Sequence, residues 1–374
     1  MSAQKIDVLF IAGVDSSAAV LACDLFNKLT ANKLTVRGAV INDQNIDDLT
    51  QTRIDVIITL DDAAADGTPH LGGNPRRMHW PMPDQAEAEP AAAIESHLPG
   101  LQTIVSKTIH ASALHLEPGV STCVFRPDVF DPPVHMPLVA AAGFKCIDLN
   151  CAAGTGDFPW DQPDKVAQLA RISRDTGVAV FSVHAECGLG ASSGTRTEAY
   201  AIDSLKRFAD LAVELGAVSV TMHAGRAADH LHDSFAQLRD YVRHLPCRYA
   251  WENGVDRLTA QQHGDWIRTL DPAAFSFVLD TGHANINGNT ESYIDACAGL
   301  FSNLHVNDNN GEKDQHRTPG RGTVPWQNLL PGLERCGYVG PLMLEVEARD
   351  RRDDATALAE LRASIDHIKQ SAPV

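Results

Sequence analysis

Residues 178–224 contain one complete unit of the predicted fold. The unit consists of the apolar run VAVFSVHA (178–185), the segment SLKRFADLAVELG (204–216) and a second apolar run, AVSVTMHA (217–224). The two runs are rich in strand-forming residues, and the segment between them repeats apolar residues at the i, i+3, i+4 spacing of a helix. The sequence therefore predicts a strand, a helix and a second strand, an order that is typical of parallel sheets.

The same unit recurs eight times between residues 119 and 374. Each copy has a short apolar, β-branched run, a turn and a segment with helical periodicity. Eight units of nearly even spacing, over a length close to the ~250 residues typical of the fold, predict an α/β protein with a (β/α)8 TIM barrel. Asp353 or Asp354 is expected to cap the last helix, at 355–369. The expected strands are 119–124, 145–151, 178–185, 217–224, 248–253, 275–284, 300–308 and 341–348.

Residues 1–105 predict a second, smaller α/β domain of three layers ahead of the barrel. Apolar, β-branched runs alternate there with segments of helical periodicity, which indicates a parallel sheet with helices packed on it. Residues 106–118 form the expected linker, and 119–374 the barrel. The expected strands of the small domain are 6–14, 33–41 and 53–61, and its expected helices are 15–30 and 90–105.

The composition argues against several classes of function. There are 31 Lys and Arg against 48 Asp and Glu, a net charge of −17, and this disfavours nucleic acids and anionic membranes as partners. No run of eighteen apolar residues and no signal-peptide pattern is present. The eight cysteines form no C-x-x-C pair, so we expect reduced thiols and a cytoplasmic protein.

Residues of metal-ligand type gather at the carboxyl ends of the predicted barrel strands. In TIM barrels these ends build the active site, so the side chains are expected to converge on one rim. Imidazole and carboxylate without cysteine suit Zn²⁺, Mn²⁺ or Co²⁺, and we expect a divalent cofactor, with Zn or Mn favoured and one to three ions bound. The predicted ligands are His184, His223, Glu252, Asp280, His283, His305, Asp314, His316 and Glu345.

Seven segments of the barrel resemble one superfamily. They are VHA, MHAG, WENG, LDTGHANING, LHVND, DQHRTPGRGTVPW and LEVE. In this order they resemble the xylose-isomerase-like barrels, a superfamily of sugar-phosphate isomerases, epimerases and endonuclease IV-type AP endonucleases. The resemblance implies that Glu252, Asp280, His305 and Glu345 form the metal site common to both branches. The other five predicted ligands resemble those that complete a three-zinc cluster in the endonuclease branch, where Glu252 would bridge two metals.

Three classes of function follow from the resemblance. An isomerase or epimerase of a small polyhydroxy or phosphorylated compound would use the metal to polarise a carbonyl, with Glu252 and Glu345 as acid and base. A trinuclear zinc phosphoesterase, acting on a small molecule, is the alternative. A metal-dependent lyase or dehydratase, or a non-catalytic binding protein, comes third. The loops after the first two predicted histidines carry one arginine each, Arg196 and Arg226, so DNA is a poor substrate guess.

Four further residues are expected near the substrate. Arg317 and Arg321 lie close to the predicted metals and suit a phosphate, a carboxylate or a sugar hydroxyl, with exposed loop arginines as the alternative. Asp148, at the end of the second strand, is expected to contact substrate or to cap a turn. Asn253 continues the ENG motif and is expected to bind substrate or to form a strand-end turn.

The N-terminal segment resembles a different family. VLFIAGVDSSAA (8–19), DVIITLDDAA (55–64) and HWPMPDQ (79–85) are similar to low-molecular-weight tyrosine phosphatases and arsenate reductases. Those enzymes need a C-x5-R loop, whose two key positions here are Ala12 and Ala18, so we expect neither chemistry. Packing against the barrel mouth, homo-oligomerisation and ligand binding are the alternatives for this degenerate domain.

Overall fold

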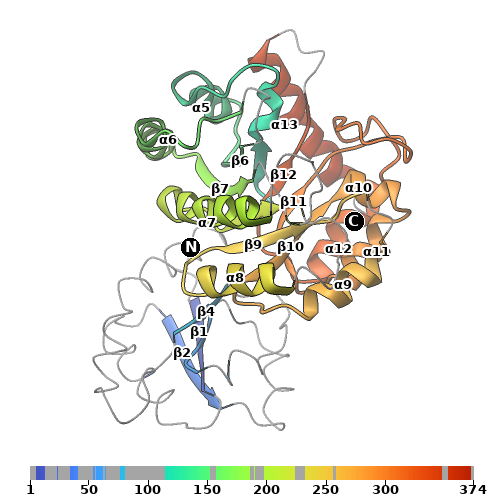
Figure 1. Cartoon of the computed structure of the whole chain (residues 1–374). Coiled ribbons are helices and arrows are strands. Elements are labelled where there is room, and N and C mark those ends of the chain that lie inside the picture. Colours follow the sequence, from blue (N-terminus) through green and yellow to red (C-terminus); the bar gives the residue numbers. More distant parts are fainter. Residues whose placement is uncertain are drawn as a thin grey trace.

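The computed structural model of the chain contains an N-terminal parallel sheet and a barrel (Figure 1). The expected helix at 90–105 lies wholly outside the described residues, and so do most of the expected helix at 15–30 and most of the linker at 106–118. The structure describes residues 6–12, 23, 34–40, 54, 56–61, 64, 76–80, 114–151, 157–185, 189, 198–223, 232–255, 258–347 and 353–371.

Parallel strands form the barrel, in the order β11-β10-β9-β8-β7-β6-β5-β12. The ring closes between β11 and β12, where the Val306 N–H donates to the Met343 carbonyl (2.8 Å) and the Glu345 N–H donates to the Val306 carbonyl (3.0 Å). The predicted (β/α)8 barrel is therefore confirmed. Its strands are β5 (Pro118–Ser121), β6 (Cys146–Asn150), β7 (Ala179–His184), β8 (Ser219–Met222), β9 (Arg248–Glu252), β10 (Phe275–Asp280), β11 (Phe301–His305) and β12 (Leu342–Leu344).

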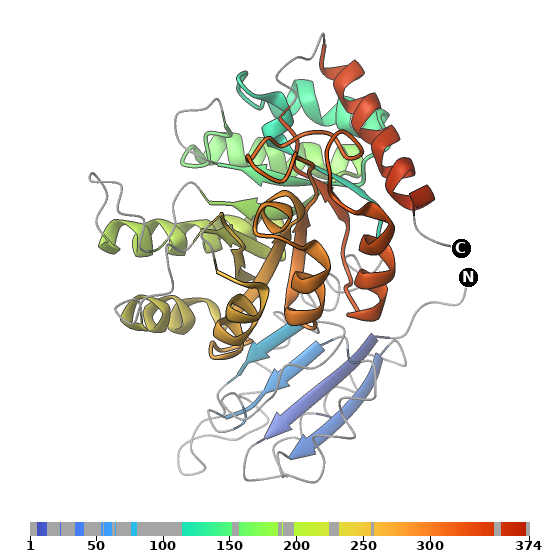
Figure 2. The ribbon, with the colours of Figure 1, turned by 90° about the vertical axis from the view of Figure 1, so that its right-hand side faces the viewer.

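Helices surround the strands and cover their outer faces (Figures 1 and 2). Their apolar stripes complete the core; in α7, for example, Leu205, Phe208 and Leu211 are buried. Burial of each such side chain contributes about 1.5–3 kcal/mol. The helices are α5 (Pro132–Ala141), α6 (Pro163–Thr176), α7 (Glu198–Leu215), α8 (His232–Val242), α9 (Ala260–Arg268), α10 (Thr281–Ile286), α11 (Thr290–Ala296), α12 (Trp326–Arg335) and α13 (Asp354–Ser371).

All eight barrel strands end before their predicted last residue, and in two of them a side chain at the strand end caps the following turn. The run at 119–124 stops at Ser121, whose hydroxyl accepts the N–H of Cys123 and starts the short 3-10 helix Thr122–Phe125. The run at 275–284 stops at Asp280, whose carboxylate accepts the N–H of His283 (2.6 Å) and starts α10. At the start of the last helix, Asp353 accepts the N–H of Thr356 (2.8 Å), as expected for a helix cap.

The N-terminal sheet contains one strand more than the sequence predicts. Its strands pair in parallel in the order β2-β1-β3-β4, with β1 at Ile6–Ala12, β2 at Leu34–Val40, β3 at Val56–Thr59 and β4 at Arg76–His79. The additional strand β4 has the sequence RRMH, and no apolar alternation marks it. Arg77 and His79 are nevertheless buried, because this edge strand is covered by the barrel.

Strand β4 meets the barrel at the end opposite its predicted rim (Figure 2). The N–H of His79 donates to the carbonyl of Arg243 (3.2 Å), and the His244 ring nitrogen Nδ1 lies 3.0 Å from the His79 carbonyl. Both barrel residues precede Arg248, the first residue of β9, and therefore lie at the amino ends of the strands. Of the alternatives for the N-terminal domain, packing against the barrel mouth is thus wrong for the described strands.

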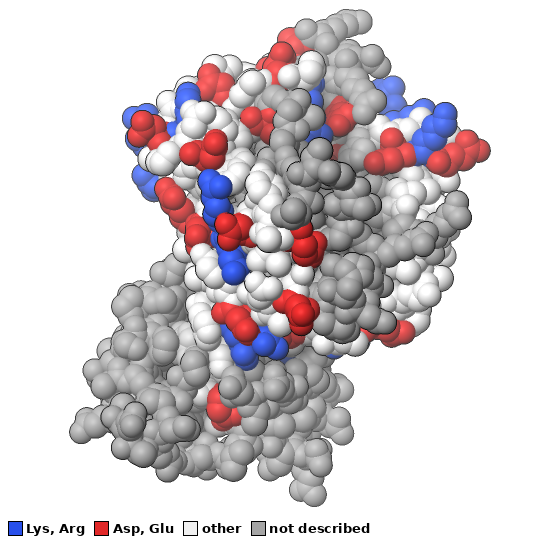
Figure 3. Space-filling model, in the orientation of Figure 1, with Lys and Arg blue, Asp and Glu red and all other residues white. Residues whose placement is uncertain are grey.

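The described surface carries charges of both signs. On the face drawn in Figure 3, lysine and arginine side chains are scattered among aspartate and glutamate rather than gathered into a basic patch. Within the described part of the chain, no helix is both long and apolar enough to span a membrane. All seven described cysteines are free thiols, in agreement with the expectation from their spacing.

Candidate metal centre

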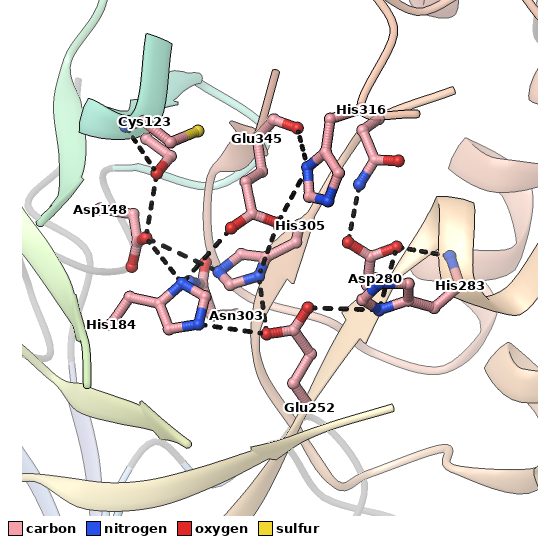
Figure 4. A network of polar contacts seen from close by, with 12 residues as sticks. Cys123, Asp148, His184, Glu252, Asp280, His283, Asn303, His305, His316 and Glu345 are labelled. Carbon is pink, nitrogen blue, oxygen red and sulfur yellow. Dashed lines mark hydrogen bonds and ion pairs between the residues drawn. The ribbon is translucent and has the colours of Figure 1, made fainter. Parts of the chain in front are cut away.

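The barrel strands bring the predicted ligands to one rim (Figure 4). His184, Glu252, Asp280 and His305 are the last residues of β7, β9, β10 and β11, and Glu345 directly follows β12. All five are buried. Because neighbouring parallel strands present their carboxyl ends at the same edge, residues far apart in sequence converge here.

Four of these residues form a central cluster: Glu252, Asp280, His305 and Glu345. Each offers a nitrogen or oxygen atom, and these atoms all lie within 4.8 Å of one another. The His305 Nδ1 atom is 3.1 Å from Glu252 Oε2 and 3.2 Å from Glu345 Oε2. These three atoms are buried without a hydrogen bond among the described residues. Buried polar atoms that converge in this way fit a bound cation.

A layer of amides holds Asp280 in place. Its backbone N–H donates to Asn253 Oδ1 (2.8 Å), and Asn253 Nδ2 donates to its carbonyl (2.9 Å). Asn307 Nδ2 donates to Asp280 Oδ2 (2.6 Å). Asn253 is completely buried, and both of its polar side-chain atoms bond to backbone. The amide of Asn253 therefore ties β9 to β10, and its expected substrate contact stays a prediction.

A further buried group that could hold an ion overlaps the central cluster and contains Asp148, His184, His305 and Glu345. Two other clusters flank the central one. In the first, His184 Nε2 lies 3.1 Å from His223 Nε2, and His223 Nε2 lies 3.4 Å from Glu252 Oε2. Glu252 thus belongs to this cluster and to the central one. In contrast to the buried central cluster, this one opens to solvent, because the His223 side chain is 48% exposed.

The second flanking cluster contains His283, Asp314 and His316. His283 Nε2 and His316 Nε2 lie 3.2 Å and 3.1 Å from the two oxygens of Asp314, whose side chain is 40% exposed. The backbone of His316 has a φ of 44°, a left-handed conformation that is uncommon outside glycine. Such strained residues persist where the surroundings fix them, as they do at functional sites. Here the ring nitrogen Nδ1 also contacts the carbonyl of Glu345 (3.1 Å).

The loop that carries Asp314 and His316 is organised by Asp308, which the sequence did not single out. One oxygen of this buried carboxylate accepts the N–H groups of Gly320 and Gly322 (2.9 Å each) and the indole N–H of Trp326 (3.2 Å). The other oxygen accepts the N–H of Val324 (3.1 Å). The PGRGTVPW segment is therefore wrapped around a single carboxylate. In the sequence, the aspartate that ends the LHVND segment (304–308) is the feature that could have indicated this role.

The electrostatics of the rim favour ionised glutamates. Burial raises the pKa of Glu252, but His305 and His223 outweigh it and lower this pKa to about 2. Glu345 behaves alike: burial is outweighed by His305 and His184, and its pKa falls well below the usual value. Burial dominates at Asp280, where it raises the pKa to about 6.

The imidazoles respond to the same carboxylates. Burial alone would lower each histidine pKa, yet the two glutamates raise the pKa of His305 well above the usual value. At His316, hydrogen bonding to Asp314 likewise outweighs burial and raises the pKa to about 10. His223 is the exception: part of its side chain is exposed, but the desolvation of its ring, which faces Glu252 and His184, prevails and lowers its pKa. The carboxylates and imidazoles of the rim therefore pair as opposite charges, and a bound metal cation would displace protons from the imidazoles.

The remaining substrate candidates lie in different surroundings. Arg317 and Arg321 are exposed, and the Arg317 guanidinium donates to the carbonyl of Arg321 (3.3 Å), so their substrate contacts stay predictions. Asp148 is completely buried beside His184 and His305, and its substrate contact also stays a prediction.

Arg126, at the end of the short 3-10 helix, was missed by the sequence analysis. Its guanidinium donates to Asp157 (3.1 Å), Asn150 (2.7 Å) and Glu347 (3.1 Å). Asn150 in turn approaches the His184 ring (3.4 Å). No local motif marks this arginine, because its partners come from three separate segments of the chain.

Comparisons with known proteins agree with this geometry. The family described as xylose isomerase-like TIM barrel matches residues 136–371. An uncharacterised protein of Methanocaldococcus jannaschii is 23% identical over 278 residues, which cover 69% of this chain and 92% of that protein. A probable endonuclease 4 of Mycobacterium leprae is 27% identical over 209 residues, covering 51% of this chain and 82% of that protein.

Solved structures share the fold of the barrel. The IolI protein with a bound zinc atom has a TM-score of 0.57 at 14% identity and covers 69% of this chain and 100% of its own. A D-tagatose 3-epimerase-like protein has a TM-score of 0.54 at 20% identity, with 68% of this chain and 99% of its own covered. At these identities the likeness concerns the fold alone.

Proposed function

Because the chain belongs to the xylose isomerase-like TIM barrel family, we propose that it is a divalent-metal-dependent isomerase or epimerase of a sugar or sugar phosphate. The observation that carries this proposal is the central cluster, in which nitrogen and oxygen atoms of two glutamates, Asp280 and His305 lie within 4.8 Å of one another in a buried site. Zn²⁺ or Mn²⁺ suits its oxygen and nitrogen donors. Sugar epimerases among the structural neighbours support the substrate class.

The residues of the central cluster would have two roles, metal binding and proton exchange. Glu252, Asp280, His305 and Glu345 would hold the ion, which when bound polarises a substrate carbonyl and acidifies the neighbouring C–H. Glu252 and Glu345 would exchange the proton, because both are carboxylates held ionised in a buried site. Asp280 is already occupied by an amide and a backbone N–H, which suits a fixed ligand better than a proton carrier.

Solvent exchange of substrate protons tests this proposal. Wild-type protein loaded with Mn²⁺ or Zn²⁺ should exchange a carbon-bound proton next to the carbonyl with D₂O for at least one member of a panel of ketoses and ketose phosphates. Glu252→Gln and Glu345→Gln should each lower the exchange rate by about 10²-fold or more. Glu334→Gln, on the exposed face of α12, is the control and should leave the rate unchanged. Absence of exchange across the panel would contradict the proposal.

A second candidate is a trinuclear zinc phosphoesterase acting on a small molecule. The flanking clusters favour it, because one shares Glu252 with the central cluster and the other adds His283, Asp314 and His316. The similarity to a probable endonuclease 4 supports it as well. Two or three metals suit phosphoester hydrolysis, since they activate water and stabilise the leaving oxygen. About three tightly bound zinc ions per chain, with hydrolysis of bis-p-nitrophenyl phosphate, would establish this candidate in place of the first.

The roles of two arginines and the domain boundaries are also proposals. Arg317 and Arg321 would meet an anionic or hydroxyl group of the substrate, since both are exposed in the loop that carries His316. We also retain the division of the chain into a small domain at 1–105, a linker at 106–118 and the barrel at 119–374. Limited proteolysis with mass spectrometry should place the first cleavages within 106–118.

A further inference from the structure

Asp148 lies at the centre of a buried polar network next to the central cluster (Figure 4). It belongs to β6 and is completely buried. A single oxygen, Oδ2, lies 3.8 Å from His305 Nε2 and 3.9 Å from His184 Nδ1. These separations exceed a direct hydrogen bond, but a buried carboxylate at this range still orients an imidazole N–H through charge.

Two serines fix the carboxylate of Asp148 as an acceptor. Ser182 accepts the amide N–H of Asn303 (2.9 Å), and Ser121 accepts the N–H of Cys123 (3.4 Å). Each hydroxyl therefore has its own proton free to donate. Ser182 donates to Asp148 Oδ1, and Ser121 donates to Oδ2 (3.3 Å).

The consequence concerns which nitrogen of His305 carries the proton. A neutral imidazole has one N–H and one nitrogen with a free lone pair. The Nε2 side of His305 faces Asp148, whereas its Nδ1 side faces Glu252 and Glu345. A cation held between Glu252 and Glu345 would displace any proton from Nδ1, and Asp148 would then hold the remaining proton on Nε2. Histidine ligands of metals are commonly oriented by a carboxylate in this manner.

We propose that Asp148 is a positioning residue that orients His305 for metal binding, and that it is neither a substrate contact nor a ligand. His184 differs, because its Nδ1 lies closer to Glu345 (3.3 Å) than to Asp148 (3.9 Å). This inference rests on the metal centre of the proposed function but not on its reaction.

The test is titration of the metal-free full-length chain with Co²⁺, followed by visible absorption and calorimetry. In Asp148→Asn, which preserves the side-chain volume, we expect an affinity about 10- to 100-fold weaker, an altered Co²⁺ spectrum and unchanged stoichiometry. Ser182→Ala, which removes one hydroxyl that fixes Asp148, should change affinity and spectrum in the same direction but less, and this milder variant decides the matter if Asp148→Asn does not fold.

The control is Ser219→Ala, which removes another buried barrel hydroxyl. Ser219 has no hydrogen-bond partner among the described residues, and its variant should match wild type. Wild-type affinity and spectrum in Asp148→Asn would overturn the proposal. Loss of one equivalent of metal, with unchanged affinity for the rest, would also overturn it, because Asp148 would then be a ligand. Failure of the wild-type chain to bind Co²⁺ would overturn this inference and the proposed function together.

Discussion

Gly282 offers a sensitive test of how the central cluster is supported. A Cβ atom added at this position would lie 2.0 Å from Asn307 Oδ1 and 2.8 Å from Asn309 Nδ2, well inside van der Waals contact. Gly282→Ala must therefore displace Asn307. The same amide donates to Asp280 Oδ2 (2.6 Å), so the substitution also disturbs a predicted metal ligand.

The magnitude follows from three contributions. Loss of a hydrogen bond to a charged group costs about 1.5–3 kcal/mol. Overpacking of a tight site costs about 1–3 kcal/mol. Alanine in place of glycine stabilises α10 by about 1 kcal/mol, because alanine has the higher helix propensity. Gly282→Ala should thus lower the free energy of unfolding by about 3 kcal/mol and weaken metal binding.

Urea denaturation of the metal-free protein, followed by circular dichroism, measures the first effect. Gly254→Ala is the matched control, because a Cβ there meets nothing within 4 Å, and its stability should stay within about 0.5 kcal/mol of wild type. The double variant Gly282→Ala with Asn307→Ala should recover the packing part of the loss. Wild-type stability in Gly282→Ala would refute the packing derived for Asp280.

Three further predictions concern other parts of the molecule. Asp271→Asn removes the carboxylate that lies 3.5 Å from the Arg243 guanidinium at the amino end of the barrel. It should lower the free energy of unfolding, measured by urea denaturation, by about 3 kcal/mol. Metal affinity should rise with pH, by up to about tenfold per unit for each proton displaced, because the glutamates raise the pKa of the ligand His305 well above its usual value and a bound ion must displace that proton; calorimetry in buffers of different ionisation enthalpy should count the released protons. Asp308→Asn should loosen the loop that it organises and shift the fluorescence of Trp326, whereas an unchanged emission spectrum would contradict the role of this carboxylate.

The barrel could be predicted because its signals are local and repeated. Every strand is a short apolar run, and the polar residue at each carboxyl end marks the rim before any contact is known. His184, Glu252 and His305 were found in this way, since strand ends of parallel barrels always meet. Every predicted strand was too long at its carboxyl end, and at Ser121 and Asp280 the reason is that one side chain ends the strand and caps the next turn.

The rest depends on contacts between distant segments. Strand β4 is charged in sequence and buried only because the barrel covers it, so no periodicity could reveal it. Asn253 directly follows β9, as expected, whereas Asp148 lies in the middle of β6 and not at its end. The direction of both side chains, toward backbone and toward serine hydroxyls, follows from packing between neighbouring strands. The same holds for the division of nine ligand-type residues into one buried cluster and two open ones.

Metal content measured by inductively coupled plasma mass spectrometry, on protein purified without chelator, tests the central claim most directly. We expect at least one tightly held divalent ion per chain, retained in the Gly254→Ala control and lost or strongly weakened in His305→Ala, because His305 contacts both glutamates of the central cluster. One ion fits the proposed isomerase or epimerase, and three fit the phosphoesterase. A wild-type chain that holds no metal, and takes up none on titration with Zn²⁺, Mn²⁺ or Co²⁺, would contradict the account.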